Sequence, residues 1–164
     1  MSGGKDAQFD AVYAQLFGDV FAYFNVCFGA QTAEDLAQEA FLRVWKAVDS
    51  DKIPENWRAW VFRCAVNLKN DFLRKKYAES GVQSAETAVL PAAQPPDGAG
   101  LSVQNALAQL SGAERELLTL KSLGFTSEEI GEMLGVSGSA VRTRLQKAKE
   151  HFRITLQTEG VTDV

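Results

Sequence analysis

The apolar residues of this chain recur at intervals of three and four, the period of an α-helix, wherever the sequence has a regular pattern. The clearest stripe, near the N-terminus, predicts a first long helix and is formed by Phe9, Val12, Tyr13, Leu16, Phe17, Val20, Phe21 and Phe24. No run with the two-residue period of a β-strand is bounded by turn residues. The sequence therefore predicts an all-α fold.

Two more helices are predicted in the N-terminal part. Thr32 and Asp35 have the spacing of a capping box, which indicates a helix from there to about Val48. Its inward face would consist of Leu36, Ala37, Ala40, Phe41, Val44, Trp45 and Val48. Its outward face would consist of Glu34, Asp35, Gln38, Glu39 and Leu42. A third helix is predicted from about Glu55 to Tyr77.

The C-terminal part has clear helix boundaries. Its predicted N-terminal caps are the pair Ser111 and Glu114, the pair Thr126 and Glu129, and Ser137. These caps predict one helix ending at Gly124, a second over 127–134 ending at Gly135, and a third from Gly138 to about Leu156. A short helix, a turn with glycine and a longer helix form the plan of a helix-turn-helix. The two helices would pack through Ile130, Leu134, Val136, Val141 and Leu145.

A stretch without basic residues, rich in Ala, Gly, Ser and Pro, separates these parts. It predicts two small helical domains joined by a flexible linker. The resulting boundaries are an N-terminal helical domain at 1–77, the linker at 78–101, a C-terminal helix-turn-helix domain at 102–157, and a disordered tail at 158–164.

Composition excludes several classes of protein. His151 is the single histidine, and Cys27 and Cys64 lie among apolar neighbours without metal-ligand spacing, so we interpret both cysteines as reduced core residues. No cofactor or metal site is predicted, and the protein is not expected to be an enzyme. No run of 18 apolar residues and no signal-peptide pattern is found, which favours a cytoplasmic protein without membrane insertion.

The last predicted helix is rich in basic residues. Ser139, Arg142 and Gln146 share a face at spacings of three and four. Arginine can donate to both guanine acceptors in the major groove, and glutamine can pair with adenine. Phosphates would be neutralised by Arg144, Lys147, Lys149 and Arg153. The alternative is an ordinary solvated helix face.

The third predicted helix carries a second basic cluster, formed by Arg58, Arg63, Lys69, Arg74, Lys75 and Lys76. The aromatic residues among these cations are Trp57, Trp60, Phe62, Phe72 and Tyr77. Such a mixture suits single-stranded nucleic acid, where bases stack on rings and phosphates meet cations. The alternative, favoured for most of these aromatic residues, is a core stripe covered by charges. Folding alone does not require the three adjacent cations at 74–76.

The second predicted helix has an acidic outer face with Glu34, Asp35 and Glu39. This face is either solvated surface or a docking surface. Paired carboxylates also serve acid–base catalysis or metal binding, but no histidine or second acidic helix completes such a site here.

Three segments together resemble one family, the sigma factors of bacterial RNA polymerase. Residues 32–45, TAEDLAQEAFLRVW, resemble a signature of that family. Residues 57–67 and 71–76 look like its helix for the minus-ten element, and residues 110–153 are similar to its C-terminal promoter-reading domain. Two domains with a short linker resemble the minimal, extracytoplasmic-function group.

The resemblance implies a role for each matching position. The clamp helices of the largest polymerase subunit would dock on Asp35, Gln38, Glu39 and Leu42. The minus-ten element would be bound and opened by Trp57, Arg58, Trp60, Arg63, Asn67, Arg74, Lys75 and Lys76, with Asn67 near the pocket for the flipped base. The minus-thirty-five element would be read by Ser139, Arg142, Thr143, Arg144, Gln146, Lys147 and Lys149.

The implied partners are core RNA polymerase, through its clamp helices and flap, promoter DNA and an anti-sigma factor. Two departures from the family pattern concern the C-terminal domain. Gly131 replaces the usual alanine, which lowers helix propensity by about 1 kcal/mol. Lys147 and Lys149 replace arginines, so their phosphate contacts would lose bidentate geometry.

Two rival functions fit parts of the same sequence. A stand-alone helix-turn-helix regulator of the response-regulator class would need an α/β phosphoacceptor domain, for which the N-terminal half offers no strand. A sigma-like interaction module could keep the docking residues without initiating transcription. The linker favours a sigma factor, because it is long enough to span the two promoter elements. About 24 extended residues reach about 80 Å, and about 17 base pairs between the elements span about 60 Å.

Overall fold

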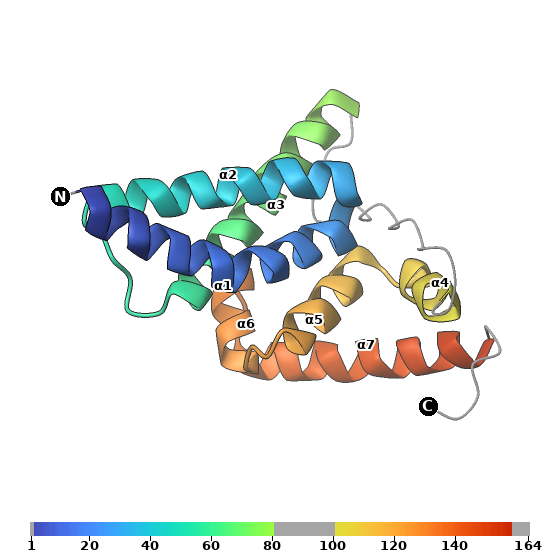
Figure 1. Ribbon diagram of the computed structural model, residues 1–164. Helices are drawn as coiled ribbons and strands as arrows, with labels where there is room; N and C mark the ends of the chain where they lie inside the picture. Colours follow the sequence, from blue (N-terminus) through green and yellow to red (C-terminus); the bar gives the residue numbers. More distant parts are fainter. Residues whose placement is uncertain (1, 81–100, 159–164) are drawn as a thin grey trace. The chain divides into compact units, whose positions relative to one another are not determined.

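The computed structural model describes residues 2–80 and 101–158 of the chain (Figure 1). Within these ranges every regular element is a helix and no strand occurs, so the all-α prediction is confirmed. The described residues fall into two compact units. The first unit is built mainly from α1 (Ser2–Phe28), α2 (Ala30–Asp49) and α3 (Trp57–Ser80). The second is built from α4 (Leu101–Gln109), α5 (Gly112–Ser122), α6 (Ser127–Leu134) and α7 (Gly138–Thr158).

A single residue, Gly29, separates α1 from α2. Its φ of 89° lies in the left-handed region that glycine adopts without a steric penalty, and its N–H donates to the carbonyl of Asn25. Because α2 begins directly afterwards at Ala30, Thr32 already lies inside the helix. The predicted capping box of Thr32 and Asp35 is therefore wrong, although the predicted helix itself is present.

The core of the first unit lies between the facing sides of its three helices. The buried residues of α1 include Val12, Leu16, Val20, Tyr23 and Phe24. Those of α2 are Ala33, Ala37, Ala40, Phe41, Val44, Ala47 and Val48. Those of α3 include Val61, Phe62, Ala65, Val66, Leu68 and Leu73. Leu36 and Trp45, which were expected inside, are only partly buried, and Tyr13 is 41% exposed.

By length and composition alone, residues 3–28 of α1 are apolar enough to cross a membrane. The core helices of water-soluble proteins can meet the same criterion. In this structure the Phe17 ring contacts Phe41 of α2, and the Tyr23 ring contacts Phe62 of α3 at a centroid distance of 6.1 Å. The apolar stripe of α1 thus serves as a core face of the first unit.

Helix caps define the second unit as predicted. Both capping boxes are complete: Ser111 with Glu114 begins α5, and Thr126 with Glu129 begins α6. Gly135, with a φ of 74°, ends α6 at the expected residue. The Ser137 hydroxyl accepts the Ala140 N–H at 3.0 Å, at the start of α7. The helix-turn-helix is confirmed, and its contact is centred on the buried side chains of Ile130, Val141 and Leu145.

The ends of the predicted linker belong to helices. Residues 78–80 continue α3, and Leu101 begins α4, a helix that the sequence patterns do not predict. α4 packs on α7, so tertiary contact accounts for this helix. The rest of the predicted linker, 81–100, and the tail residues 159–164 lie outside the described residues.

Gly131 allows α6 to approach the following turn closely. A Cβ at this position would lie 2.5 Å from the Val136 carbonyl oxygen and 3.2 Å from the Ser137 carbonyl carbon. Its own carbonyl accepts the N–H groups of Gly135 and Val136. The glycine that lowers helix propensity is thus required by packing in the turn.

We expect Gly131→Ala to lower the free energy of unfolding by about 1–3 kcal/mol, because the new Cβ must displace backbone rather than a flexible side chain. Helix propensity alone predicts a gain of about 1 kcal/mol. Urea unfolding of the full chain measures the change. The matched control is Gly18→Ala, where open space surrounds the new Cβ in α1, so a small gain is expected. A gain at both positions would contradict the steric explanation.

Glu114 links the cap of α5 to α7. Its carboxylate accepts the Ser111 N–H at 3.1 Å, and His151 Nδ1 of α7 lies 3.0 Å from Oε2. Partial burial raises the pKa of Glu114, but the hydrogen bonds from Ser111 and His151 outweigh burial and hold that pKa below its ordinary value. The ionised carboxylate therefore stabilises the folded state at pH values above the ordinary carboxyl pKa. This contribution is lost as the pH falls through the lowered pKa.

Glu114→Gln keeps a hydrogen-bond acceptor for Ser111 but loses the charge that faces His151. We expect it to lower the free energy of unfolding at about pH 5 by less than about 1 kcal/mol, since His151 is half exposed. Below the lowered pKa the difference from the wild type should shrink toward zero. Urea unfolding at about pH 5 and about pH 3 checks this. An equal difference at both pH values would mean that the charge is unimportant.

Candidate functional site

The outer face of α2 presents a cluster of exposed side chains that we call the docking face: Asp35, Gln38, Glu39 and Leu42. These residues lie opposite the buried alanines and aliphatic residues that hold α2 in the core. Leu42 is 52% exposed among acidic neighbours. The structure thus places all four predicted residues together on one accessible surface.

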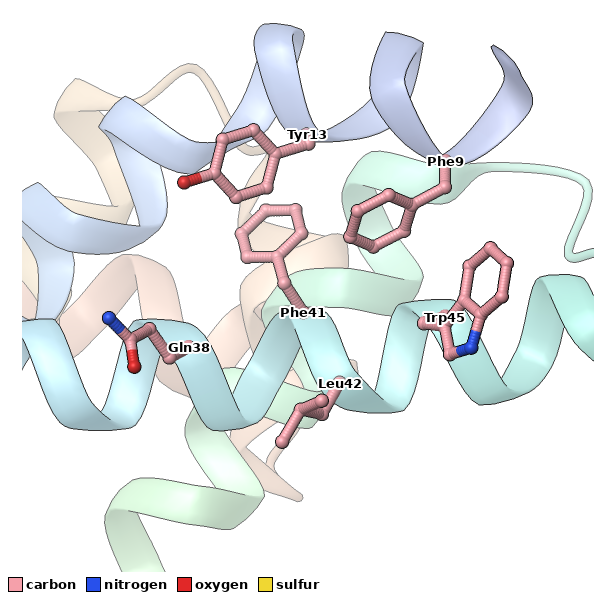
Figure 2. Close-up of a pocket in the computed structure, with 6 residues that line it drawn as sticks. All are labelled: Phe9, Tyr13, Gln38, Phe41, Leu42 and Trp45. Carbon is pink, nitrogen blue, oxygen red and sulfur yellow. The ribbon is translucent and has the colours of Figure 1, made fainter. Parts of the chain in front are cut away.

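An apolar groove of about 350 Å³ adjoins the docking face (Figure 2). Phe9 and Tyr13 reach into it from α1, and the α2 side chains that line it are Gln38, Phe41, Leu42 and Trp45. The Phe9 ring meets Trp45 edge-on at 5.6 Å, and the Tyr13 ring meets Phe41 edge-on at 5.1 Å. The groove shares Gln38 and Leu42 with the docking face.

The polar side of α3 presents Arg63, Asn67, Asn70 and Arg74, all exposed and spaced by three or four residues along one helix face. Lys75 and Lys76 are exposed beside them. At the start of α3, Trp57 and Trp60 pack edge-to-face at 5.5 Å, and both are partly exposed. The structure therefore arranges aromatic rings and cations along one helix. Two members of the predicted mixture are not part of this surface: Phe62 is fully buried in the core, and Lys69 is buried as well.

Two predicted DNA-contacting arginines of α3 already have carboxylate partners. Arg58 donates to Asp19 of α1 at 2.9 Å and lies over the Phe62 ring at 5.7 Å from its centroid. Arg74 pairs with Asp71 one turn earlier. Arg58 is thus part of the contact between α1 and α3, whereas Arg74 stays exposed at the surface.

The outer face of α7, which we call the α7 face, carries every residue predicted to read the upstream promoter element. All are exposed: Ser139, Arg142, Thr143, Arg144, Gln146, Lys147 and Lys149. The Thr143 hydroxyl donates to the Ser139 carbonyl at 3.2 Å, which turns that side chain back along the helix. Val141, Leu145 and Ala148 on the opposite side are buried.

Arg142 contacts a residue that the sequence analysis did not single out. Its Nη1 donates to Glu128 Oε1 of α6 at 2.5 Å. This hydrogen bond is the main reason that the pKa of Glu128 lies below its ordinary value. A second exposed pair on α7 joins Arg153 to Glu150, also at 2.5 Å.

The structure adds three residues to these surfaces that the sequence patterns do not indicate. Tyr13 lines the groove, Asn70 is exposed on the polar side of α3, and Glu128 pairs with Arg142. Tyr13 was assigned to the core because it belongs to the apolar stripe of α1. Asn70 could have been found by continuing the spacing from Asn67 to Arg74. Glu128 carries no local signal, since its partner lies fourteen residues away on another helix.

The described residues contain no group of three or more metal-ligating side chains. Neither Cys27 nor Cys64 forms a disulfide, and burial raises the pKa of Cys64, which disfavours a reactive thiolate.

Comparison with known proteins matches both parts of the chain. The family model for sigma-70 region 2 matches residues 13–79, and that for sigma-70 region 4 matches residues 100–152. The ECF RNA polymerase sigma factor SigW of Bacillus subtilis is 29% identical over 94% of this chain and 91% of its own length. The ECF sigma factor SigL of Mycobacterium tuberculosis is 32% identical over 81% of this chain and 79% of its own length.

Solved structures share the fold. The sigma factor RpoE of Bartonella quintana, in complex with the anti-sigma factor NepR, has a TM-score of 0.75 and 22% identity, covering 92% of this chain and 97% of its own. CnrH, in complex with the cytosolic domain of CnrY, has a TM-score of 0.64 and 21% identity, covering 93% of this chain and 90% of its own. With the helix-turn-helix and both sequence matches, this shows that the chain belongs to the extracytoplasmic-function group of the sigma-70 family, the sigma factors that direct bacterial RNA polymerase to promoters.

Proposed function

We propose that this sigma factor uses three surfaces in promoter recognition. The docking face and its groove bind core RNA polymerase, the polar side of α3 binds and opens the minus-ten element, and the α7 face reads the minus-thirty-five element. One observation carries the proposal: on α2 and on α7 the matching residues are all exposed, opposite the faces that form the core. We further propose that the domains predicted at 1–77 and 102–157 act separately, joined by a linker that lies between α3 and α4, inside the predicted range 78–101.

The proposed occupant of the docking face is the pair of clamp helices of the largest polymerase subunit. Exposed Leu42 and Tyr13 offer apolar area to a partner helix, as in helix-in-groove recognition. Asp35 and Glu39, with Glu34 nearby, surround this area with negative charge. A helix with an apolar stripe and basic flanks is the complementary partner.

On α3, the proposed roles differ from residue to residue. Asn67 is exposed between Arg63 and Arg74, so its amide is accessible to a base while the arginines meet phosphates. Trp57 and Trp60 offer ring surface to an unstacked base. Because Arg58 is engaged by Asp19, we propose that it mainly fixes α3 against α1 and contributes less to DNA binding.

Run-off transcription tests the proposed function directly. Purified core polymerase with this chain should initiate from a promoter class that core polymerase alone does not use. A chain that binds core polymerase without initiating would be the interaction module. Operator binding without any effect of core polymerase would indicate the stand-alone regulator.

We infer three further properties of this chain. The structures of RpoE with NepR and of CnrH with CnrY support an anti-sigma factor as a regulatory partner. Membership in the sigma-factor family supports the other two properties, that this protein is not an enzyme and that it acts in the cytoplasm. Co-purification from its own host, followed by mass spectrometry, would identify such a partner.

The free chain is expected to bind promoter duplex weakly. Its net charge of −4 opposes long-range attraction to phosphate. In the holoenzyme the polymerase tethers both DNA-binding surfaces and raises their effective concentration. Fluorescence anisotropy at physiological salt should therefore detect sequence-specific binding for the holoenzyme and not for the free chain. Nanomolar, specific binding by the free chain would support the operator-binding rival.

A further inference from the structure

The pair of Glu128 and Arg142 joins the two helices of the helix-turn-helix. Glu128 is the second residue of α6, and Arg142 lies in the first half of α7. The Arg142 Nη1 atom is 2.5 Å from Glu128 Oε1, and the two side chains are 58% and 66% exposed. The pair therefore lies on the accessible side of the motif, where the predicted base-reading residues are.

Gly138, the first residue of α7, makes room for the Glu128 carboxylate. A Cβ at this position would lie 2.9 Å from Glu128 Oε1 and 3.2 Å from Cδ. The carboxylate thus lies against the first turn of α7, where the helix dipole favours negative charge. The Glu128 carboxylate is therefore held in two ways, by the hydrogen bond from Arg142 and by its position against the start of α7.

This arrangement leaves Arg142 able to read a base while it stays paired. A guanidinium has five N–H donors, and the bond to Glu128 comes from Nη1 alone. The remaining donors can face the two major-groove acceptors of guanine. An unpaired arginine on its flexible chain would instead neutralise phosphates of any sequence. The carboxylate beside the guanidinium also repels phosphates. It therefore weakens the contact of Arg142 with the DNA backbone that would replace the base contact at a mismatched sequence.

We propose that Glu128 is a positioning residue that determines specificity: it holds Arg142 for base readout and keeps that arginine from phosphate. The proposal rests on the proposed function of the α7 face as the reader of the upstream element. The role proposed for Glu128 is to lower the affinity for mismatched sequences rather than to raise the affinity for the cognate one.

The test compares Glu128→Gln with Glu150→Gln in holoenzyme reconstituted from the full chain and core polymerase. Both substitutions remove one negative charge and release one arginine from a pair of similar exposure whose shortest N–O distance is 2.5 Å. Arg153 also donates from Nε to the second oxygen of Glu150 at 3.2 Å. The two glutamates differ in position: Glu150 lies in the later part of α7, beyond the residues proposed to read bases, whereas Glu128 lies in α6 beside Arg142. Binding to a library of upstream-element variants is measured, and Arg142→Ala identifies the base positions that Arg142 reads.

Glu128→Gln should raise affinity for mismatched elements and reduce discrimination at the Arg142 positions by about threefold or more, a part of the range expected for a bidentate base contact. Glu150→Gln should raise affinity for all elements alike and leave base preference unchanged, because it unmasks a phosphate-binding charge only. Gly138→Ala should reproduce the loss of discrimination without removing a charge, since its Cβ displaces the carboxylate. Thermal unfolding confirms that each variant is folded.

Three outcomes would overturn the inference. If Arg142→Ala relaxes base preference and Glu128→Gln does not, Glu128 is surface charge only. If Glu128→Gln and Glu150→Gln change all elements by the same factor, Glu128 acts through net charge only. If Arg142→Ala itself changes no base preference, the proposed role of the α7 face fails, and the inference fails with it.

Discussion

Replacing Asp35 and Glu39 together by lysine is expected to lower the affinity for core RNA polymerase by about a hundredfold or more. Both side chains are exposed on the docking face. Two new positive charges against a basic partner surface cost several kcal/mol, and about 1.4 kcal/mol is a tenfold change in affinity. The free energy of unfolding should change by less than about 1 kcal/mol, because neither residue is buried. Binding of labelled protein to core polymerase without DNA measures the effect.

The matched control reverses two exposed acidic residues elsewhere in the first unit, Glu55 and Glu79. This control produces the same change in net charge and leaves the docking face intact. If contacts at the docking face rather than net charge set the affinity, the affinity of the control for core polymerase should stay within about twofold of the wild type. Circular dichroism should show equal helicity for both double variants. Equal affinity for core polymerase in the two double variants would show that the acidic face of α2 is solvated surface.

Arg142→Ala and Lys149→Ala should separate base reading from phosphate binding on α7. Arg142 lies early in the helix on the face of Ser139 and Gln146, and its guanidinium is held at the surface by Glu128. Its removal should cost about 1–3 kcal/mol at the cognate upstream element and relax preference at one or two base positions. Holoenzyme binding to a library of promoter variants measures both effects.

Lys149 lies two turns further along α7, where a helix inserted by its N-terminal half leaves the groove. Lys149→Ala should weaken binding to all sequences alike and lower the slope of log affinity against log salt by about one ion. Altered base preference in Lys149→Ala, with unaltered preference in Arg142→Ala, would mean that α7 is inserted by its other end.

Much of the second unit could be predicted because its signals are local. A capping box needs only residues three positions apart, and a left-handed glycine ends a helix by its own conformation. These signals located α6 to the residue. The first unit gave weaker boundary signals: Thr32 has the sequence of a cap, but the chain is already helical there because Gly29 turns it directly from α1 into α2.

The sequence by itself determined the all-α class, the helix-turn-helix and the outward faces of α2 and α7, because helical period and caps act between residues a few positions apart. Only the tertiary structure decided that Tyr13 lines a groove, that Arg58 is held by Asp19, that Gly131 makes room for the Val136 carbonyl and that Glu128 holds Arg142. Each of these depends on residues from different elements, whose distance is set by how the helices pack. A one-dimensional pattern carries no information about that distance.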